Sequence, residues 1–270
     1  MPPKDSIANT FLVSLALCIV CSLMVSTAAV ALKETQETNK LLDRQRNIVE
    51  AAGLSENAGS LSGKEVQSIF ENIERKLVDL STGEYVEAEE NYDPRKAAKN
   101  EEENVDIKPI GGGIGIPKRE KLTWVYLVKN KEGGLDQVIL PIYGKGLWST
   151  LYGYAALKND FETLNGLTFY EHGETPGLGG EIENPKWKRQ WHDKIIWDGE
   201  PDDKNLRIGV AKGSPSGEDA KYKVDGLSGA TITSRGVDAL MKYWFSSDGF
   251  GPYLKKLTAE KGASNGSTNS

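Results

Sequence analysis

The sequence LTWVYLV at residues 122–128, followed after a polar turn by QVILPIYG at residues 137–144, decides the fold. Both segments are rich in β-branched and aromatic residues, and the turn at 129–134 ends in two glycines. This pattern predicts a β-hairpin. Further strands are predicted at 147–157, 167–170, 206–210 and 222–224. The expected class is therefore α+β, a mainly antiparallel sheet with flanking helices.

Helices are predicted before and after these strands. Ser62 and Glu65 form a capping-box pattern, and the apolar residues after them predict one helix with a single stripe. The members of this stripe are Val66, Ile69, Phe70, Ile73 and Leu77. Other helices are predicted at 40–52, 182–191 and 237–245.

Two stretches carry little apolar pattern. Residues 80–120 are mostly charged; a solvated excursion is expected at 87–103 and a flexible glycine turn at 111–115. No Lys-Ser/Thr pair follows these glycines, so a phosphate-binding loop is not expected there. The end of the chain, 258–270, contains many Ser, Asn and Gly residues and is expected to be disordered.

Residues 11–32 read FLVSLALCIVCSLMVSTAAVAL and contain no charge. A run of this length is enough to cross about 30 Å of hydrocarbon as a helix. A cleaved signal peptide is the alternative, because Ala29-Val30-Ala31 resembles a cleavage site, but the run exceeds the usual apolar region of about 7–15 residues. Lys4 precedes the span and no positive excess follows it, which favours a cytoplasmic amino terminus and a periplasmic body in a bacterium.

The expected layout has five parts. They are a cytoplasmic end (1–10), a transmembrane helix (11–32), a helical stalk with a charged insertion (33–121), a folded domain (122–257) and a disordered tail (258–270).

Composition argues against several classes of site. The formal charge of −6 and the pI near 5.2, without a Lys/Arg cluster, argue against a nucleic-acid surface. Cys18 and Cys21 both fall inside the apolar run, where they are expected to be packing residues, so the body has no disulfide. With only His172 and His192 as histidines, no metal site is expected.

The chemistry is expected in VDGLSGATITS at residues 224–234, where a strand leads through a turn of small residues into the last helix. Gly226 and Gly229 permit close backbone approach, and a helix N-terminus favours an anion such as phosphate. Ser228 or Thr231 can cap the helix. An ordinary capped helix start has the same ingredients, so these residues alone leave both interpretations open.

Residues 225–231, DGLSGAT, resemble the flavinylation motif D-x-x-[ST]-G-A-[TS] of the FMN-binding domain family. In that family a flavin transferase splits FAD, releases AMP and leaves FMN as a phosphoester on the last hydroxyl of the motif. The resemblance implies covalent FMN at Thr231, with Thr233 as the chief rival. It assigns the rest of the cofactor-binding turn to Asp225, Ser228, Gly229 and Ala230.

Two more segments resemble the same family. Residues 174–179, ETPGLG, match a loop that lies against the flavin, and residues 144–148, GKGLW, match a G-x-G-L-W element. The resemblance implies that Glu174 and Thr175 bond to the flavin. Trp148 is expected either to border the flavin ring or to pack in the core, and Lys145 is a candidate to balance the charge of the reduced form. Backbone contact is implied for Gly177, Leu178 and Gly179.

The order of span, helical stretch, insertion and domain is similar to the flavin subunits of two bacterial inner-membrane complexes, a sodium-pumping NADH:ubiquinone reductase and the Rnf complex. The long interval 33–121 favours the first. The resemblance implies a one-electron carrier coupled to sodium export, with other integral subunits and a flavin transferase as partners and no catalysis of its own. The alternative from another class is an exported binding or scaffold protein without flavin.

Overall fold

The computed structural model describes residues 6–55, 58–87, 92–108, 113–130 and 132–267. The chain divides into two compact units, Met1–Arg44 and Gln45–Ser270, and the boundary falls within helix α1, Ile7–Ala51. In the described part of the first unit, α1 has an 18-residue window with a mean hydropathy of 2.5, none of it buried. By length and composition, this helix can cross a bilayer.

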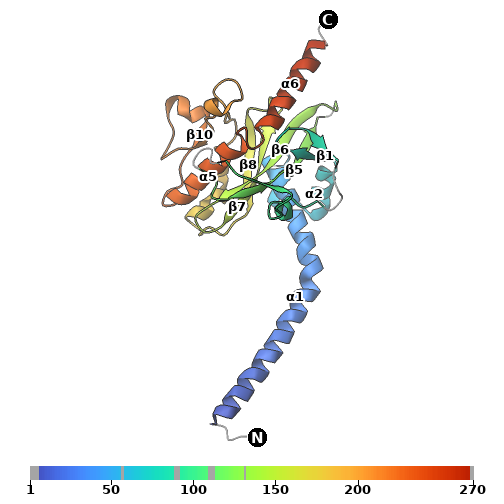
Figure 1. Ribbon diagram of the computed structural model, residues 1–270, viewed down its shortest axis with the longest axis vertical. Helices are drawn as coiled ribbons and strands as arrows, with labels where there is room; N and C mark the ends of the chain where they lie inside the picture. Colours follow the sequence, from blue (N-terminus) through green and yellow to red (C-terminus); the bar gives the residue numbers. More distant parts are fainter. Residues whose placement is uncertain (1–5, 56–57, 88–91, 109–112, 131, 268–270) are drawn as a thin grey trace. The chain divides into compact units, whose positions relative to one another are not determined.

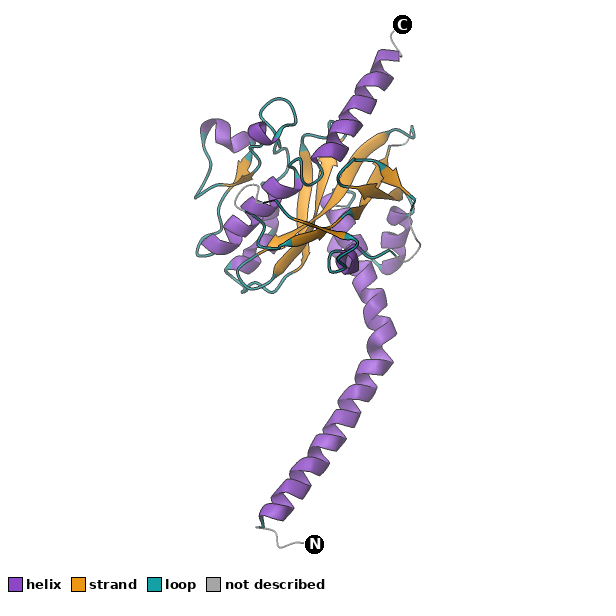
Figure 2. Ribbon diagram, in the orientation of Figure 1, coloured by secondary structure: helices purple, strands orange, loops and turns teal. Residues whose placement is uncertain are grey.

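A six-stranded sheet forms the centre of the second unit (Figures 1 and 2). Every neighbouring pair is antiparallel, as the sequence predicts. In spatial order the strands are β2 (Tyr85–Val86), β1 (Ile73–Asp79), β5 (Leu122–Lys129), β6 (Leu135–Lys145), β7 (Thr150–Lys158) and β8 (Leu164–Glu171).

Alternating side chains of the sheet enter two separate cores. Leu127 and Leu140 belong to the larger core, whereas Val128 and Ile139, their next neighbours along the same strands, belong to the smaller one. Because successive side chains of a strand point to opposite faces, each core lies on its own face of the sheet.

Helices α5 (Thr231–Trp244) and α6 (Gly251–Ser267) supply the larger core. Trp244 is fully buried, and its Nε1 donates to the carbonyl oxygen of Tyr143 over 2.7 Å. Gly144 lies so close to α5 that a Cβ there would be 2.7 Å from Cβ of Leu240. The contact fixes α5 against the end of β6, which positions the site described below.

The smaller core is closed by the last residues of α1 and by Phe70 of α2 (Gly63–Phe70). A Cβ on Gly166 would lie 2.4 Å from the carbonyl oxygen of Ala51. Asn165 donates from Nδ2 to the carbonyl oxygen of Ala52 over 2.8 Å. The final turn of α1 is therefore part of the packed domain.

The remaining elements are short. Two small sheets pair β3 (Asn104–Asp106) with β4 (Lys118–Glu120), antiparallel, and β9 (Gly209–Val210) with β10 (Lys223–Val224), parallel. The short helices are α3 (Pro94–Ala97), α4 (Pro185–Arg189) and the 3₁₀ turns η1 (Ala58–Ser60), η3 (Gly179–Glu183), η4 (Asp203–Asn205) and η5 (Gly217–Lys221).

The helix predicted from the apolar residues Val66 to Leu77 is wrong in its second half. The Ser62–Glu65 capping box is present, but the helix ends at Phe70, and Ile73 begins strand β1. A spacing of four residues is even, so Ile73 and Leu77 share a face in a strand as readily as in a helix. Seven residues of this segment pair with β5, and this pairing makes the segment a strand.

The predictions for the charged interval 80–120 are also partly wrong. Ala97, inside the solvated excursion expected at 87–103, is 2% exposed. Arg119 and Glu120 of β4 are 4% and 2% exposed, and Ile114, inside the predicted glycine turn, is 2% exposed. Arg95 of α3 donates to both carboxylate oxygens of Glu171 and stacks 3.7 Å from the ring centroid of Tyr152. Residues 88–91 and 109–112 of this interval lie outside the described residues.

Two boundaries change as a result. The sheet includes β1, so the folded domain does not begin at residue 122 but takes in strands from the interval 33–121. The predicted disorder from residue 258 is wrong as far as Ser267, because α6 continues to that residue. Residues 268–270 of the predicted tail lie outside the described residues.

Candidate functional site

A buried carboxylate joins three loops at the end of β6. Glu174 is 5% exposed, and its oxygens accept hydrogen bonds from the backbone N–H groups of Leu147 (3.2 Å), Trp148 (2.9 Å) and Ser149 (3.2 Å). Its Oε2 also accepts from the hydroxyl of Thr233 over 2.6 Å. One side chain thus holds together the β6–β7 turn, the loop after β8 and the first turn of α5.

This arrangement keeps Glu174 ionised. Burial raises the pKa of a carboxyl group, but here the hydrogen bonds from Thr233, Trp148, Ser149 and Leu147 outweigh burial and lower the pKa of Glu174 below its usual value of 4.5. The sequence predicted that this side chain bonds to the flavin. In the structure its carboxylate binds donors from the protein itself, so Glu174 holds the loops of the site together.

Glycines allow the loops to close around this carboxylate. A Cβ on Gly146 would lie 2.6 Å from Oε1 of Glu174, and one on Gly179 would lie 2.6 Å from the Thr233 hydroxyl. Gly177 has φ +76 and open space around its Cβ position. A side chain would therefore be excluded by contact at the first two positions and by backbone conformation at the third.

The two candidate acceptor threonines have opposite environments. Thr233 is 1% exposed and donates to Glu174, whereas Thr231, the first residue of α5, is exposed. Ala230 occupies the N-cap position, and no side chain caps the helix. The predicted capping by Ser228 or Thr231 is therefore not found. The first N–H groups of α5 remain available for an anion.

Exposed apolar side chains gather on the same three loops. Leu147 is 44%, Trp148 67%, Leu178 45% and Ile232 54% exposed. A Cβ on Gly229 would lie 3.1 Å from Cδ2 of Leu178, so the turn that carries Thr231 lies beside the ETPGLG loop. We call these four exposed apolar residues, Leu147, Trp148, Leu178 and Ile232, the apolar rim.

The remaining predicted residues have mixed roles. Asp225 is held by α4 and its C-cap: its N–H donates to Gln190 (2.9 Å), its Oδ2 accepts from Gln190 (3.3 Å), and its carbonyl oxygen accepts from Trp187 (2.8 Å). Thr175 is exposed, and its carbonyl oxygen accepts from the N–H of Gly180 over 2.9 Å. The Lys145 side chain is exposed, while its N–H donates to the carbonyl oxygen of Ile114 over 2.7 Å.

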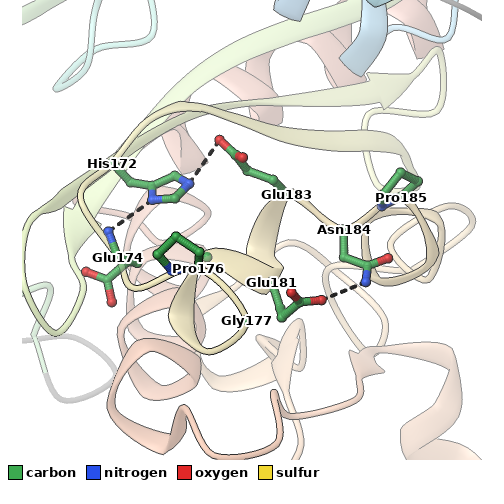
Figure 3. Close-up of a pocket in the computed structure, with 9 residues that line it drawn as sticks. His172, Glu174, Pro176, Gly177, Glu181, Glu183, Asn184 and Pro185 are labelled. Carbon is green, nitrogen blue, oxygen red and sulfur yellow. Dashed lines mark hydrogen bonds and ion pairs between the residues drawn. The ribbon is translucent and has the colours of Figure 1, made fainter.

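A pocket with a volume of about 360 Å³ lies beside the ETPGLG loop, and Figure 3 shows the residues that line it. Its lining residues come from the end of β8, from that loop and from η3 and α4; they are His172, Glu174, Pro176, Gly177, Gly180, Glu181, Glu183, Asn184 and Pro185. In the sequence, His172 counts only as one of two histidines, too few to predict a metal site. No local pattern shows that it supports the loop.

The described residues fit a flavin mononucleotide. The apolar rim suits a flat aromatic ring system, and the uncapped start of α5 suits a phosphate. Thr231, the first residue of that helix, carries an exposed hydroxyl there. These features define the class of the protein as an FMN-binding domain carried on an apolar helix, and the FMN-binding domain family matches residues 146–246.

Similar proteins indicate the family within this class to which the chain belongs. The chain is 46% identical to the Na(+)-translocating NADH-quinone reductase C subunit of Haemophilus ducreyi, over 96% of this chain and 98% of that protein. It is 48% identical to the corresponding protein of Pseudomonas aeruginosa, over 95% and 98%. The crystal structure of Shewanella oneidensis NqrC has a TM-score of 0.73 at 34% identity, covering 83% of this chain and 99% of that one.

The chain belongs to the NqrC family, the C subunits of the Na(+)-translocating NADH-quinone reductase. Of the two membrane complexes that the sequence suggested, this family corresponds to the sodium-translocating reductase and not to Rnf. The match to an FMN-binding domain likewise favours the flavoprotein over the scaffold protein.

The hydrogen bonds around Glu174 make a prediction about stability and pH. Glu174→Gln places an amide N–H₂ where only acceptors fit, so we expect the free energy of unfolding at pH 7 to fall by about 1–3 kcal/mol. Because the pKa of Glu174 is lowered in the folded chain, its contribution is complete above its usual pKa of 4.5 and is lost as the pH falls through the lowered value. Urea denaturation of the full chain in detergent, from pH 7 to pH 3, measures both effects.

Thr233→Val is the matched control, because it removes only one of the donors to Glu174 and should cost about 1 kcal/mol. The difference between the wild-type chain and Glu174→Gln should shrink toward acid pH. A difference that stays constant down to pH 3 would show that the charge of Glu174 does not hold the loops.

Proposed function

We propose that this chain carries FMN as a phosphoester on Thr231 and passes single electrons within a Na(+)-translocating NADH-quinone reductase. The observation that supports the acceptor is the contrast between the two threonines. Thr231 is exposed at the uncapped start of α5, whereas Thr233 is 1% exposed and engaged with Glu174.

The attachment requires a second protein. The Thr231 oxygen would form a bond to the phosphorus on the FMN side of FAD, the bond from that phosphorus to the bridging oxygen would break, and AMP would leave with that oxygen. A neutral hydroxyl needs a base to take its proton during this step. Among the described residues no carboxylate or imidazole bonds to the Thr231 hydroxyl, which supports a separate flavin transferase as the source of the base.

The chain's residues have separable duties once the cofactor is attached. FMN supplies the reversible one-electron chemistry. The first N–H groups of α5 would face the phosphate, and the apolar rim would keep water from the ring. The exposed ammonium group of Lys145, at the end of β6, would favour a reduced and negatively charged ring. Glu174 holds these loops together from below the surface.

The chain would act beside the other subunits of the complex. Helix α1 would serve as a single-pass anchor in the bacterial inner membrane, with the domain on the periplasmic side. A covalent link suits that location, because FMN lost from a domain outside the cytoplasm would not readily be replaced.

The acceptor assignment predicts the outcome of a paired substitution. After coexpression with a flavin transferase, the wild-type chain should fluoresce in a denaturing gel under ultraviolet light. Thr231→Val should give a dark band, because the exposed hydroxyl is gone. Thr233→Val should remain fluorescent, because its hydroxyl faces Glu174.

Thr231→Ser is the conservative control and should restore fluorescence. Circular dichroism of each variant shows whether it has folded. A dark wild-type band would contradict the flavoprotein, while a fluorescent Thr231→Val band with a dark Thr233→Val band would move the acceptor to Thr233.

The position of Trp148 predicts a spectroscopic change. An indole next to the flavin ring quenches flavin fluorescence, so Trp148→Ala should raise the emission of the folded, flavin-loaded chain. Trp124→Ala, on β5, is the matched control and should leave the emission unchanged. After denaturation all three proteins should emit equally. Equal emission in the folded state would remove Trp148 from the site.

The proposed topology predicts the labelling of a cysteine added after Ser270 in a chain whose Cys18 and Cys21 are replaced by Ser. A maleimide that cannot cross the inner membrane should label this cysteine in cells with a permeabilised outer membrane. Labelling that requires lysis of the inner membrane would place the domain in the cytoplasm.

A further inference from the structure

The imidazole of His172 lies under the base of the ETPGLG loop (Figure 3). Its side chain is 9% exposed. Its Nδ1 is 3.1 Å from the backbone nitrogen of Glu174, and its Nε2 is 3.0 Å from Oε1 of Glu183. The ring therefore bridges the start of the loop and the 3₁₀ turn η3 that follows it.

These partners select one form of the ring. A peptide N–H is always a donor, so Nδ1 must carry a lone pair and cannot carry a proton. The proton of the neutral ring then sits on Nε2, which lies 3.0 Å from Oε1 of Glu183 but without the geometry of a hydrogen bond. The N–H of Glu174 thus fixes this tautomer, as a hydrogen-bond partner on one ring nitrogen generally fixes the state of the other.

We propose that His172 is a positioning residue for the ETPGLG loop and that it holds the loop only as the neutral ring with its proton on Nε2. It acts through the main chain of Glu174, the same residue whose carboxylate joins the three loops of the site. That the loop faces FMN rests on the proposed function above, whereas the hydrogen bond to Glu174 does not.

Protonation changes the balance of these two contacts. A second proton on Nδ1 would point at the N–H of Glu174, so the hydrogen bond to the loop is lost. The positive ring is at the same time attracted more strongly to Glu183 on η3. Protonation therefore weakens the contact of the ring with the loop and strengthens its contact with η3.

Other charged groups near the ring are already engaged. Glu171, on the same strand end, pairs with Arg95 at 2.9 Å. Glu181, on η3, accepts from Asn184 over 2.7 Å. The carboxylate of Glu174 is occupied by the backbone of 147–149 and by Thr233. Among the described carboxylates near the ring, Glu183 is therefore the one that can pair with a positively charged His172.

Two substitutions at His172 distinguish the effect of the hydrogen-bond acceptor from the effect of protonation. In His172→Asn the Oδ1 atom takes the place of Nδ1, so it can accept from Glu174 but cannot gain a proton. His172→Leu has nearly the same shape as Asn and no acceptor. The readout is hydrogen exchange at the Glu174 amide of the full chain in detergent, before flavin attachment, expressed as protection relative to the intrinsic rate at each pH.

At pH 8 we expect His172→Leu to reduce protection of the Glu174 amide about fivefold, the factor that one net hydrogen bond contributes, and His172→Asn to retain it. When acid pH adds the second proton to the ring, the wild-type chain should lose about the same factor. The Asn variant should show no such step.

Full protection in the Leu variant, or the same acid step in the Asn variant, would overturn the proposal. If the Leu variant does not fold, as judged by exchange at Leu140 in the larger core, the comparison of the wild-type chain with the Asn variant still decides. Because no flavin is present, this result is independent of the fluorescence test of Thr231. A dark band in that test would remove the proposed function and leave the role of His172 standing.

Discussion

The site depends on one charge in a small enclosed space. The carboxylate of Glu174 receives hydrogen bonds from three consecutive backbone N–H groups and one hydroxyl, which come from two other loops of the fold. Buried carboxylates are tolerated when donors surround them, and these donors would be costly to leave unpaired if the charge were removed. The buried carboxylate and its buried donors therefore satisfy one another, and the loops that carry them have little freedom to separate.

The sheet makes this arrangement possible. Strand β6 ends where the tight contact between Gly144 and Leu240 fixes α5, so the first turn of that helix lies next to the β6–β7 turn. Gly236, further along α5, is pressed against the backbone of Lys145, since a Cβ there would lie 2.3 Å from its carbonyl oxygen. At this junction the backbone of α5 is in direct contact with the backbone of β6. The position of α5 is consequently set by backbone shape more than by long, adjustable side chains.

Local patterns in the sequence predicted the parts of the fold that local physics decides. The β5–β6 hairpin and the capping box of α2 are both confirmed, because alternation and capping act over a few residues. Strand β1 was missed because Ile73 and Leu77 fit either period, and only pairing with β5 distinguishes them. The buried end of the charged interval was missed because Arg119 and Glu120 become acceptable inside the protein only through distant partners, such as Tyr243 and Tyr143.

The candidate site shows the same limit, because motifs brought Glu174, Thr231 and Trp148 to attention, but nothing local says that Glu174 points inward or that His172 supports its main chain. The choice between Thr231 and Thr233 depends on the rotation of α5 about its axis, which is fixed by packing against the sheet.

That rotation also bears on how uniform the finished protein is. The first turn of α5 contains hydroxyls on Thr231, Thr233 and Ser234, and two of them are committed inside the fold: Thr233 donates to Glu174, and Ser234 accepts from the N–H of Leu227 over 2.9 Å. Under the proposed function, a modifying enzyme that meets the folded chain would find a single free hydroxyl on this turn. Every molecule would then hold its cofactor at the same point, and electron transfer, whose rate falls steeply with distance, would proceed at one rate across the population.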